Sequence, residues 1–262
     1  MPRLAANLSF LFNELPLIER IGAAAAAGFK GAEILFPYTR ELADLRAAYR
    51  EAGIAPVLFN TPPGDWDAGE RGFAAIPGFE PLFKAHLTEA MAYALFAGCS
   101  RLHAMAGIPP ADADPADCEA VFIENLRMAA EDAAPYGITI TIEPINPIDV
   151  PGYFLTRQDQ AVRILEAVDM ANAALQMDFY HCARVEGDPA GCFRRNFPRI
   201  GHIQIAGVPA RNEPGTGELD YRPLFALIDK TGYGGWVACE YHPRAGTLAG
   251  LGWAREWGIG AD

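Results

Sequence analysis

The chain has 262 residues, 51% of them hydrophobic, and a formal net charge of −12 from 33 acidic and 21 basic residues. The apolar content suffices for a sizeable core and excludes a disordered chain. The negative charge repels phosphate backbones and anionic lipid, so the sequence predicts neither nucleic-acid binding nor a membrane-surface role. An anionic substrate would therefore need local cations or a bound metal.

Cysteine usage and hydropathy indicate a cytoplasmic protein. The five cysteines are scattered and form no CxxC pattern, which suits a reducing compartment better than a disulfide framework. No run approaches the roughly 18 apolar residues that span a bilayer. The N-terminal stretch LAANLSFLF is interrupted by Asn7 and Ser9, so we interpret it as a first strand and turn rather than as a signal peptide.

Short β-like runs alternate along the chain with longer helical ones. Eight runs have strand character: residues 3–8, 31–36, 54–60, 101–107, 138–143, 173–179, 200–206 and 235–241. The amphipathic stretches between them often end in glycine, as helix C-termini do. Eight strands, each followed by a helix, predict an α/β protein folded as a single (β/α)₈ TIM barrel. Since no segment resembles a linker, we expect one domain over residues 1–262.

A doubly wound open sheet is the competing fold. Such a sheet usually carries a glycine-rich phosphate turn after its first strand. Here the first strand is followed by SFLFNELP, which contains no glycine. This favours the barrel, in which the chemistry lies at the mouth formed by the C-terminal ends of the strands.

The fifth predicted strand ends in a charge. In GITITIEPINP, residues 137–147, isoleucine and threonine alternate until the run stops at Glu143. A buried carboxylate without a partner costs several kcal/mol. Glu143 should therefore have a partner, a bound metal or a catalytic task.

The next three strands end in the same way. Asp178, Gln204 and Glu240 occupy the corresponding positions between apolar neighbours, and alternation directs these side chains, with Glu143, into the barrel mouth. Carboxylates gathered there repel one another unless a cation lies among them. Oxygen ligands favour Mg²⁺ or Mn²⁺, with Co²⁺ or Zn²⁺ as alternatives. One acidic residue at a strand end is commonly a helix N-cap or a loop ion pair, but four polar residues at one register point to a site.

Two further residues are expected above the proposed metal. His181 follows Asp178 by three residues and is either a structural hydrogen-bond partner or a substrate contact. Arg211 lies in the Gly/Pro-rich stretch VPARNEPGTGELDY. In so acidic a protein, an arginine beside the mouth is a candidate clamp for a substrate carboxylate.

The loop of residues 62–72, PPGDWDAGERG, follows the third predicted strand and carries Arg71. It is either a lid that excludes water from the site or a surface loop. His103 ends the fourth predicted strand and is a second candidate for lining the site, with a substrate-binding role.

Seven motifs together resemble those of the hydroxypyruvate isomerases: ANLSFLF, GDWDAGERG, IEPIN, QMDFYH, GHIQIA, NEPGTGELDY and CEY. These enzymes belong to the xylose-isomerase-like TIM barrels, beside the 2-oxo-tetronate isomerases and the ketose 3-epimerases. The resemblance covers nearly the whole chain in order. It implies that the two glutamates form the acid/base pair and that a divalent metal is held by Glu143, Asp178, Gln204 and Glu240.

The resemblance also bears on the neighbouring residues. In the related epimerases, the residues that match His181 and Arg211 contact substrate oxygens. Those epimerases commonly place a histidine ligand where this chain has Gln204, which favours the isomerase branch. The segment RLHAMAG differs from the more apolar sequence that is associated with this strand in the family, so the resemblance assigns no role to His103.

The reaction that this resemblance implies is the interconversion of hydroxypyruvate and tartronate semialdehyde (2-hydroxy-3-oxopropanoate) through an enediolate. One of Glu143 and Glu240 would remove a proton from the hydroxyl-bearing carbon, and the other would return one to the neighbouring carbon. The partner would be a small anionic hydroxy-oxo acid, oriented by Arg211 or Arg71. A homo-oligomer is compatible with the sequence.

The sequence leaves three other classes of function open. A 2-oxo-tetronate isomerase or a ketose 3-epimerase would use the same two glutamates on a longer substrate. Metal-dependent phosphodiester cleavage, as in the endonuclease IV family, clusters many histidines, whereas this chain has five and the wrong charge for DNA. A non-catalytic barrel that binds a sugar or an acid also fits, because an active and an inactive site can differ by less than about 1 Å.

Overall fold

A parallel sheet curls round a common axis at the centre of the computed structural model, which describes residues 1–260. The strand order is β3-β2-β1-β9-β8-β7-β6-β5-β4. The two outermost strands, β3 (Ala55–Pro56) and β4 (Phe59–Asn60), are consecutive in the chain and belong to the single predicted strand 54–60. Together they occupy one strand position that joins both edges of the sheet. The nine strands therefore make a closed barrel with eight strand positions. This confirms the predicted (β/α)₈ fold.

The strands fall within the eight predicted segments and are shorter than predicted. For example, residues 101–107 contain only three strand residues. Besides β3 and β4, the strands are β1 (Arg3–Asn7), β2 (Gly31–Glu33), β5 (Arg101–His103), β6 (Thr139–Ile142), β7 (Ala173–Asp178), β8 (Ile200–Ile205) and β9 (Trp236–Cys239).

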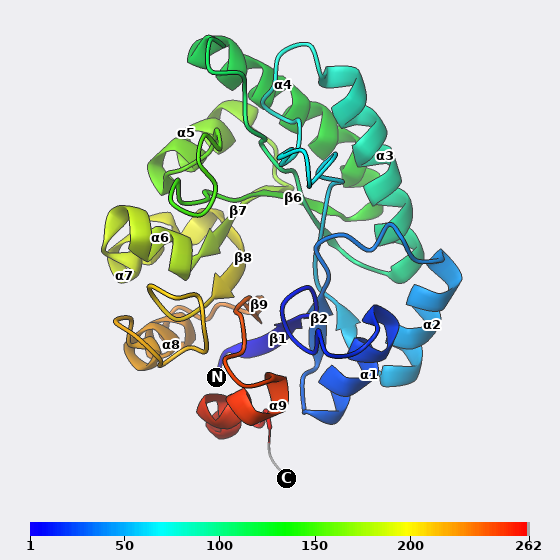
Figure 1. Cartoon of the computed structure of the whole chain (residues 1–262). Coiled ribbons are helices and arrows are strands. Elements are labelled where there is room, and N and C mark those ends of the chain that lie inside the picture. The colour runs from blue at the N-terminus through cyan, green and yellow to red at the C-terminus, as the bar shows by residue number, and fades with distance from the viewer. Residues whose placement is uncertain (261–262) are drawn as a thin grey trace.

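Helices surround the barrel on its outer side (Figure 1). They are α1 (Leu17–Ala26), α2 (Leu42–Ala52), α3 (Glu80–Ala97), α4 (Pro115–Ala133), α5 (Gln158–Val168), α6 (Phe179–Glu186), α7 (Pro189–Asn196), α8 (Tyr221–Lys230) and α9 (Thr247–Gly250). Short 3₁₀ helices follow α4 (Ala134–Tyr136), α7 (Phe197–Arg199) and α9 (Leu251–Trp257). Each of the eight strand positions is thus followed by at least one helix, and β7 is followed by two.

Glycine ends several of these helices as predicted. Gly53 and Gly98 follow α2 and α3 with φ angles of 66° and 82°, a left-handed conformation that costs glycine little. Each N–H caps its helix by donating to the carbonyl four residues earlier, Tyr49 and Ala94 respectively. These caps turn the chain back toward the next strand.

The barrel interior has an apolar lower layer and a polar upper layer. A small cluster of Ala5, Val57, Leu58, Trp236 and Ala238 is buried apart from the main core. The main core packs the strands against the surrounding helices. Asn7, Glu33, Thr141, Gln176 and His202 are also fully buried, but they are polar. They lie toward the C-terminal ends of their strands and so form the floor of the barrel mouth.

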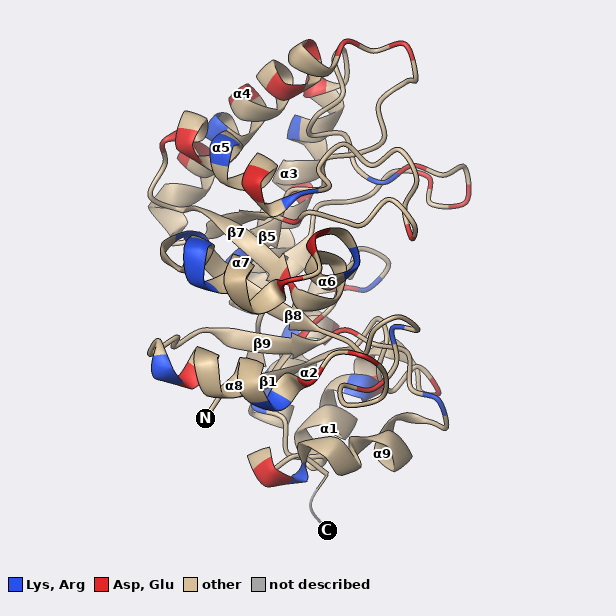
Figure 2. Ribbon diagram, turned by 90° about the vertical axis from the view of Figure 1, so that its left-hand side faces the viewer, with Lys and Arg blue, Asp and Glu red and all other residues tan. Residues whose placement is uncertain are grey.

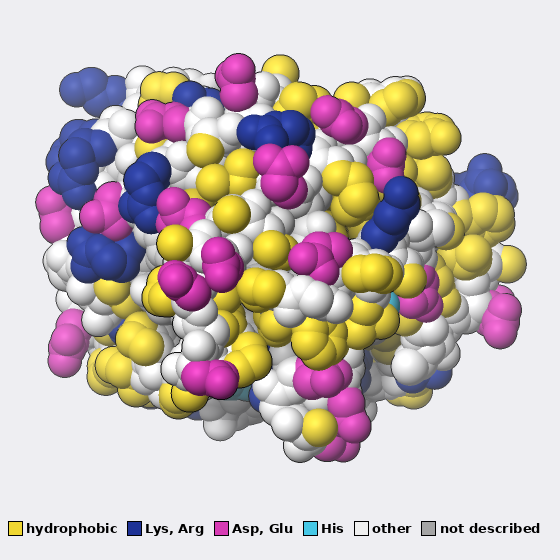
Figure 3. All heavy atoms as spheres, turned by 90° about the horizontal axis from the view of Figure 1, so that it is seen from above, with side chains coloured by type: hydrophobic (Ala, Val, Ile, Leu, Met, Phe, Trp, Pro, Cys, Tyr) yellow, Lys and Arg dark blue, Asp and Glu magenta, His cyan; other side chains and the backbone are white. Residues whose placement is uncertain are grey.

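Charged residues lie mainly on the helices and connecting loops, whereas the strands are largely uncharged (Figure 2). On the face seen from above, acidic and basic side chains are interspersed among hydrophobic ones (Figure 3). Among the described residues, no helix is both long and apolar enough to cross a membrane.

Candidate active site

The four predicted strand-end residues lie together at the C-terminal mouth of the barrel. Asp178 is the last residue of β7, Gln204 lies in β8, and Glu143 and Glu240 directly follow β6 and β9. All four are buried, with at most 5% of each residue exposed. Parallel strand pairing places Asp178 in register with Gln204, while Glu143 and Glu240 each follow the last paired residue of their strands.

Glu143 and Glu240 lie at opposite ends of a chain of two amides. The Gln176 amide nitrogen lies 3.2 Å from Glu143 Oε2 and 2.7 Å from Gln204 Oε1. The amide nitrogen of Gln204 in turn donates to Glu240 Oε2. The two glutamates are therefore joined through these amides at the barrel mouth.

Two buried carboxylate oxygens of the site accept no hydrogen bond. They are Glu143 Oε1 and Asp178 Oδ2, and neither has a hydrogen-bond partner within the described part of the chain. His181 Nε2 lies 3.8 Å from the first and 3.7 Å from the second, and the three atoms lie within 4.8 Å of one another. Buried carboxylate oxygens that lack hydrogen bonds and lie this close together suit a divalent cation. The residues present therefore fit a metal site.

The hydrogen bonds of His181 show which of its nitrogens carries the proton. Asn146 donates to His181 Nδ1 from its backbone N–H at 3.3 Å, and its side-chain nitrogen lies 2.7 Å away. The Asn146 side-chain oxygen is engaged by the N–H groups of Ile148 and Asp149, so the amide cannot be reversed. Nδ1 is thus an acceptor, and Nε2 carries the proton.

Burial, with the nearby Arg211 adding to it, lowers the pKa of His181 well below its usual value, so the ring is neutral. Its Nε2–H then faces Glu143 and Asp178 as a donor. A nitrogen that carries a proton cannot ligate a cation. The geometry therefore favours a hydrogen-bond donor role for His181 Nε2 over a place among the metal ligands.

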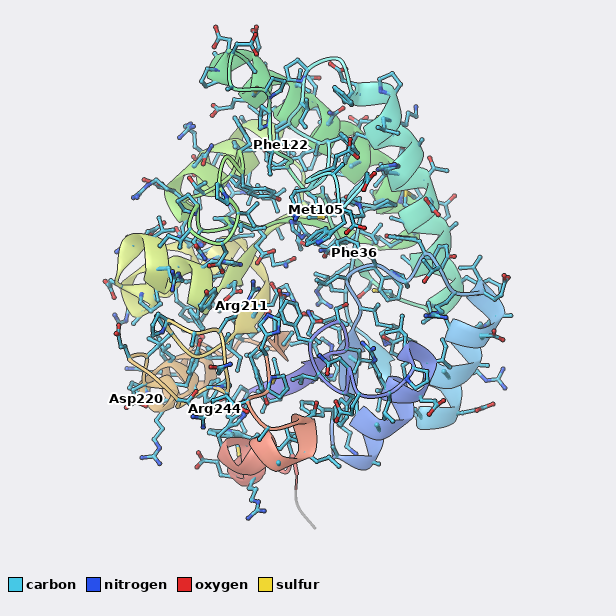
Figure 4. All side chains as sticks on the ribbon, viewed as in Figure 1. Phe36, Met105, Phe122, Arg211, Asp220 and Arg244 are labelled. Atoms are coloured by element: carbon cyan, nitrogen blue, oxygen red, sulfur yellow. The ribbon has the colours of Figure 1, made fainter. Side chains whose placement is uncertain are left out.

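Arg211 lies against the carboxylates rather than in solvent. One of its terminal nitrogens lies 2.5 Å from Glu240 Oε1 and 3.7 Å from Asp178 Oδ2. The guanidinium also lies over the rings of Phe10 and Tyr180, 4.9 and 5.1 Å from their centroids. Figure 4 shows Arg211 near the middle of the ring of elements, with Asp220 and Arg244 farther out. Stacking on two rings fixes the plane of the guanidinium at the mouth.

The carboxyl groups of the site bind protons more tightly than ordinary carboxyls. Burial, reinforced by Glu240 and Asp178, raises the pKa of Glu143 well above its usual range. Burial likewise raises the pKa of Asp178 to about 6 and that of Glu240 to about 8, although Arg211 opposes the rise in both. Such groups can hold or release a proton near neutral pH.

The two remaining sequence candidates differ in where they lie. His103 is buried beside the site, with Nδ1 3.6 Å from Glu143 Oε2, and neither ring nitrogen has a hydrogen-bond partner in the described chain. Burial, with His202 nearby, lowers its pKa to about 3, so the ring is neutral. Arg71 stacks over Trp66 at 3.6 Å and donates to the carbonyls of Trp66 and Glu70. The contacts of Arg71 in the described structure thus lie within its own loop.

Sequence reasoning missed the buried residues that hold the site from below. Glu33, at the end of β2, is fully buried and accepts a hydrogen bond from Gln204. The signal that could have found it is a single charge inside the otherwise apolar run GAEILF, residues 31–36. Asn146 and Gln176 orient His181 and Gln204 and carried no comparable signal, because neutral amides are common in strands and loops.

Residues 21–257 match the sequence model of a family described as the xylose isomerase-like TIM barrel. The chain belongs to this family. The resemblance seen in the sequence motifs is thereby confirmed.

Relatives with assigned names are similar over nearly their full length. A 2-oxo-tetronate isomerase of Cupriavidus necator is 53% identical over 257 residues, 98% of this chain and 99% of that protein. A hydroxypyruvate isomerase of Escherichia coli is 41% identical over 253 residues, 97% of this chain and 98% of that protein. These similarities identify the present protein as an isomerase.

Solved structures agree on the fold. A Brucella melitensis protein described as an AP endonuclease of family 2 superposes with a TM-score of 0.96 at 46% identity and covers 98% of this chain and 99% of its own. A 3-keto-D-glucoside 4-epimerase from E. coli has a TM-score of 0.81 at 20% identity and covers 98% of this chain and 100% of its own. The second similarity establishes the barrel alone.

Proposed function

We propose that the protein interconverts hydroxypyruvate and 2-hydroxy-3-oxopropanoate with the help of a divalent cation, Mg²⁺ or Mn²⁺. The observation that carries this proposal is the pair of buried glutamates, Glu143 and Glu240, which are joined through the Gln176 and Gln204 amides at the barrel mouth. Both have a raised pKa. Two such carboxyls suit a reaction that moves a proton between adjacent carbons.

The cation would be held by Glu143, Asp178, Gln204 and Glu240, and when bound it supplies a Lewis acid that stabilises negative charge on the substrate oxygens. One glutamate removes a proton from C3 of hydroxypyruvate, which gives the enediolate. The other delivers a proton to C2, and the proton of the C3 hydroxyl passes to the C2 oxygen. The reverse reaction exchanges the two roles.

His181 and Arg211 orient the substrate in this proposal. The neutral His181 presents Nε2–H toward Glu143 and Asp178, where it can donate to a substrate oxygen and assist the transfer of the hydroxyl proton. Arg211 can bind the substrate carboxylate while it stays stacked on Tyr180. His103, beside Glu143, is placed to contact the same substrate.

Replacing Arg211 with lysine should raise KM by about 10- to 100-fold with a smaller effect on kcat, because lysine keeps the charge but loses the planar fork that matches a carboxylate. Steady-state kinetics with a saturating cation measure the split. Arg71→Lys is the matched control, since Arg71 contacts its own loop. A large rise in KM for Arg71→Lys and none for Arg211→Lys would assign the carboxylate clamp to the 62–72 loop and favour a lid over a surface loop for that segment.

A longer substrate is the second candidate. The 53% identity to a 2-oxo-tetronate isomerase supports a reaction in which the same two glutamates isomerise a four-carbon acid. A ketose 3-epimerase remains a third option that rests on the shared fold. Pocket length, rather than the acid/base pair, distinguishes these reactions.

Product analysis tests the proposal. The purified protein, loaded with Mn²⁺ or Mg²⁺, is incubated with hydroxypyruvate or with a 2-oxo-tetronate, and products are followed by NMR. We expect 2-hydroxy-3-oxopropanoate from hydroxypyruvate. Turnover of the tetronate alone would establish the second candidate, and turnover of neither by the cation-loaded protein would contradict both.

The proposed partner is a small anionic hydroxy-oxo acid, and we propose neither a nucleic-acid nor a membrane partner. Although the Brucella structure is described as an endonuclease, this chain has five histidines and a net charge of −12, which oppose binding to a DNA backbone. The cytoplasmic location, the homo-oligomer and the single domain stay predictions.

A further inference from the structure

Glu33 is a buried carboxylate that the proposed reaction does not use. It is fully buried at the end of β2. Its Oε1 accepts from Asn7 Nδ2 at 2.7 Å and from Gln204 Nε2 at 2.8 Å. Its Oε2 lies 2.7 Å from His202 Nε2. With three hydrogen-bond partners, this carboxylate is satisfied without a cation of its own, unlike Glu143 and Asp178.

Glu33 and Glu240 together determine which way the Gln204 amide faces. An ionised carboxylate only accepts hydrogen bonds, and an amide nitrogen only donates them. The Gln204 nitrogen donates to both Glu33 Oε1 and Glu240 Oε2. The reversed amide would place its oxygen against two carboxylates and lose both bonds. The observed orientation is therefore the one that these two charges select.

The Gln204 oxygen consequently points away from Glu33 and toward the Glu143 side of the site. There it shares a single donor, Gln176 Nε2, with Glu143 Oε2. The Gln176 amide is itself oriented, because its oxygen accepts from Thr141 Oγ1 at 2.9 Å. A carbonyl oxygen has two lone pairs, so Gln204 Oε1 keeps one for a cation.

We propose that Glu33 is a positioning residue that holds the Gln204 nitrogen from below and so directs the Gln204 oxygen to the cation site. Glu33 touches neither the cation nor the substrate and acts through Gln204. This inference rests on the proposed function insofar as it takes Gln204 to be a metal ligand. Residues that orient metal ligands commonly change metal affinity by about 10- to 100-fold when they are replaced.

The first test is the Mn²⁺ affinity of Glu33→Gln, measured by calorimetry in the absence of substrate. Glutamine at position 33 can turn its own amide nitrogen toward Gln204 and allow that amide to reverse. We expect Mn²⁺ to bind about 10- to 100-fold more weakly. The matched control is Glu213→Gln, a buried glutamate that accepts from Arg244 outside the site, and its Mn²⁺ affinity should stay at the parent value.

The second test exchanges the hydrogen-bond donor and acceptor between positions 33 and 204. In Gln204→Glu, the new carboxylate faces both Glu33 and Glu240, and adding Glu33→Gln restores a donor and an acceptor, in exchanged positions, between residues 33 and 204. Glu33→Gln should therefore tighten Mn²⁺ binding in the Gln204→Glu background, although it weakens binding in the parent. A residue that only stabilises the fold would not produce this change of sign. If the Glu33→Gln protein does not fold, the two variants that carry Gln204→Glu test the inference by themselves.

The outcomes are distinguishable. Parent protein that binds Mn²⁺, with Glu33→Gln affinity within about twofold of the parent, would overturn the role of Glu33 and leave the proposed function intact. Weaker or unchanged Mn²⁺ binding on adding Glu33→Gln to Gln204→Glu would do the same. Parent protein that binds no Mn²⁺ would count against the proposed metal site itself, and with it this inference.

Discussion

Replacing either Glu143 or Glu240 with glutamine should lower turnover of the proposed reaction by at least about 10²-fold, the lower range for a positioned acid or base. Glutamine keeps the shape of the side chain and one acceptor oxygen, but it cannot take up a proton. Burial raises the pKa of Glu143 well above its usual range and that of Glu240 to about 8. Each group can therefore carry a proton at neutral pH, which is the capacity that glutamine removes.

Metal occupancy must be measured alongside turnover, because both glutamates are also proposed ligands. Turnover is best compared at a Mn²⁺ concentration that saturates each variant, with occupancy determined on the same samples. Glu213→Gln again serves as the matched control and should retain parent activity. Near-parent turnover in either site variant, with the cation bound, would refute the paired-glutamate mechanism.

The location of the strand-end residues could be predicted because the barrel leaves few choices. Successive side chains on a strand point inward and outward in turn, and the C-terminal ends of all the parallel strands lie at the same mouth of the barrel. Once GITITIE is interpreted as a strand with its isoleucines packed, Glu143 must be near the mouth. The structure places it there, directly after β6 and 5% exposed.

Contacts that depend on barrel closure could not be predicted in the same way. Glu33 is held by Asn7 and Gln204, which are 26 and 171 residues away in the chain. No local pattern relates positions so far apart. The predicted strand 31–36 also continued past Glu33, whereas β2 ends there, so the charge did not stand out as a strand terminus.

Side-chain orientation at the mouth was equally inaccessible. Arg71 is in a loop that the sequence placed near the site, yet its guanidinium stacks on Trp66. The proton on His181 Nε2 depends on Asn146, which lies 35 residues away.

The division of the third predicted strand into β3 and β4 also depends on contacts that the sequence does not show. Each of the two pairs with a different neighbouring strand, and Pro56 in β3 has no N–H to donate.

Stability should link the carboxylates to the cation through pH. The pKa of Asp178 is raised to about 6 and that of Glu240 to about 8, in both cases chiefly by burial, whereas both groups titrate near pH 4 in an unfolded chain. The folded protein thus holds these protons more tightly than the unfolded one. Their contribution to stability is complete below about pH 4 and is lost as the pH rises through about 6 and 8.

A divalent cation should reverse this loss, because it binds the ionised carboxylates and competes with the protons. At 100 times its Kd, a ligand adds about 2.7 kcal/mol of stability, or about 5–10 °C in Tm for a chain of this size. The increase in Tm on adding Mn²⁺ to chelator-treated protein should therefore be larger at pH 8 than at pH 5.5. Comparing samples with and without Mn²⁺ at each pH cancels the titration of distant groups. An equal increase at both pH values would contradict a cation site built from these carboxylates, since their protons would then not compete with the metal.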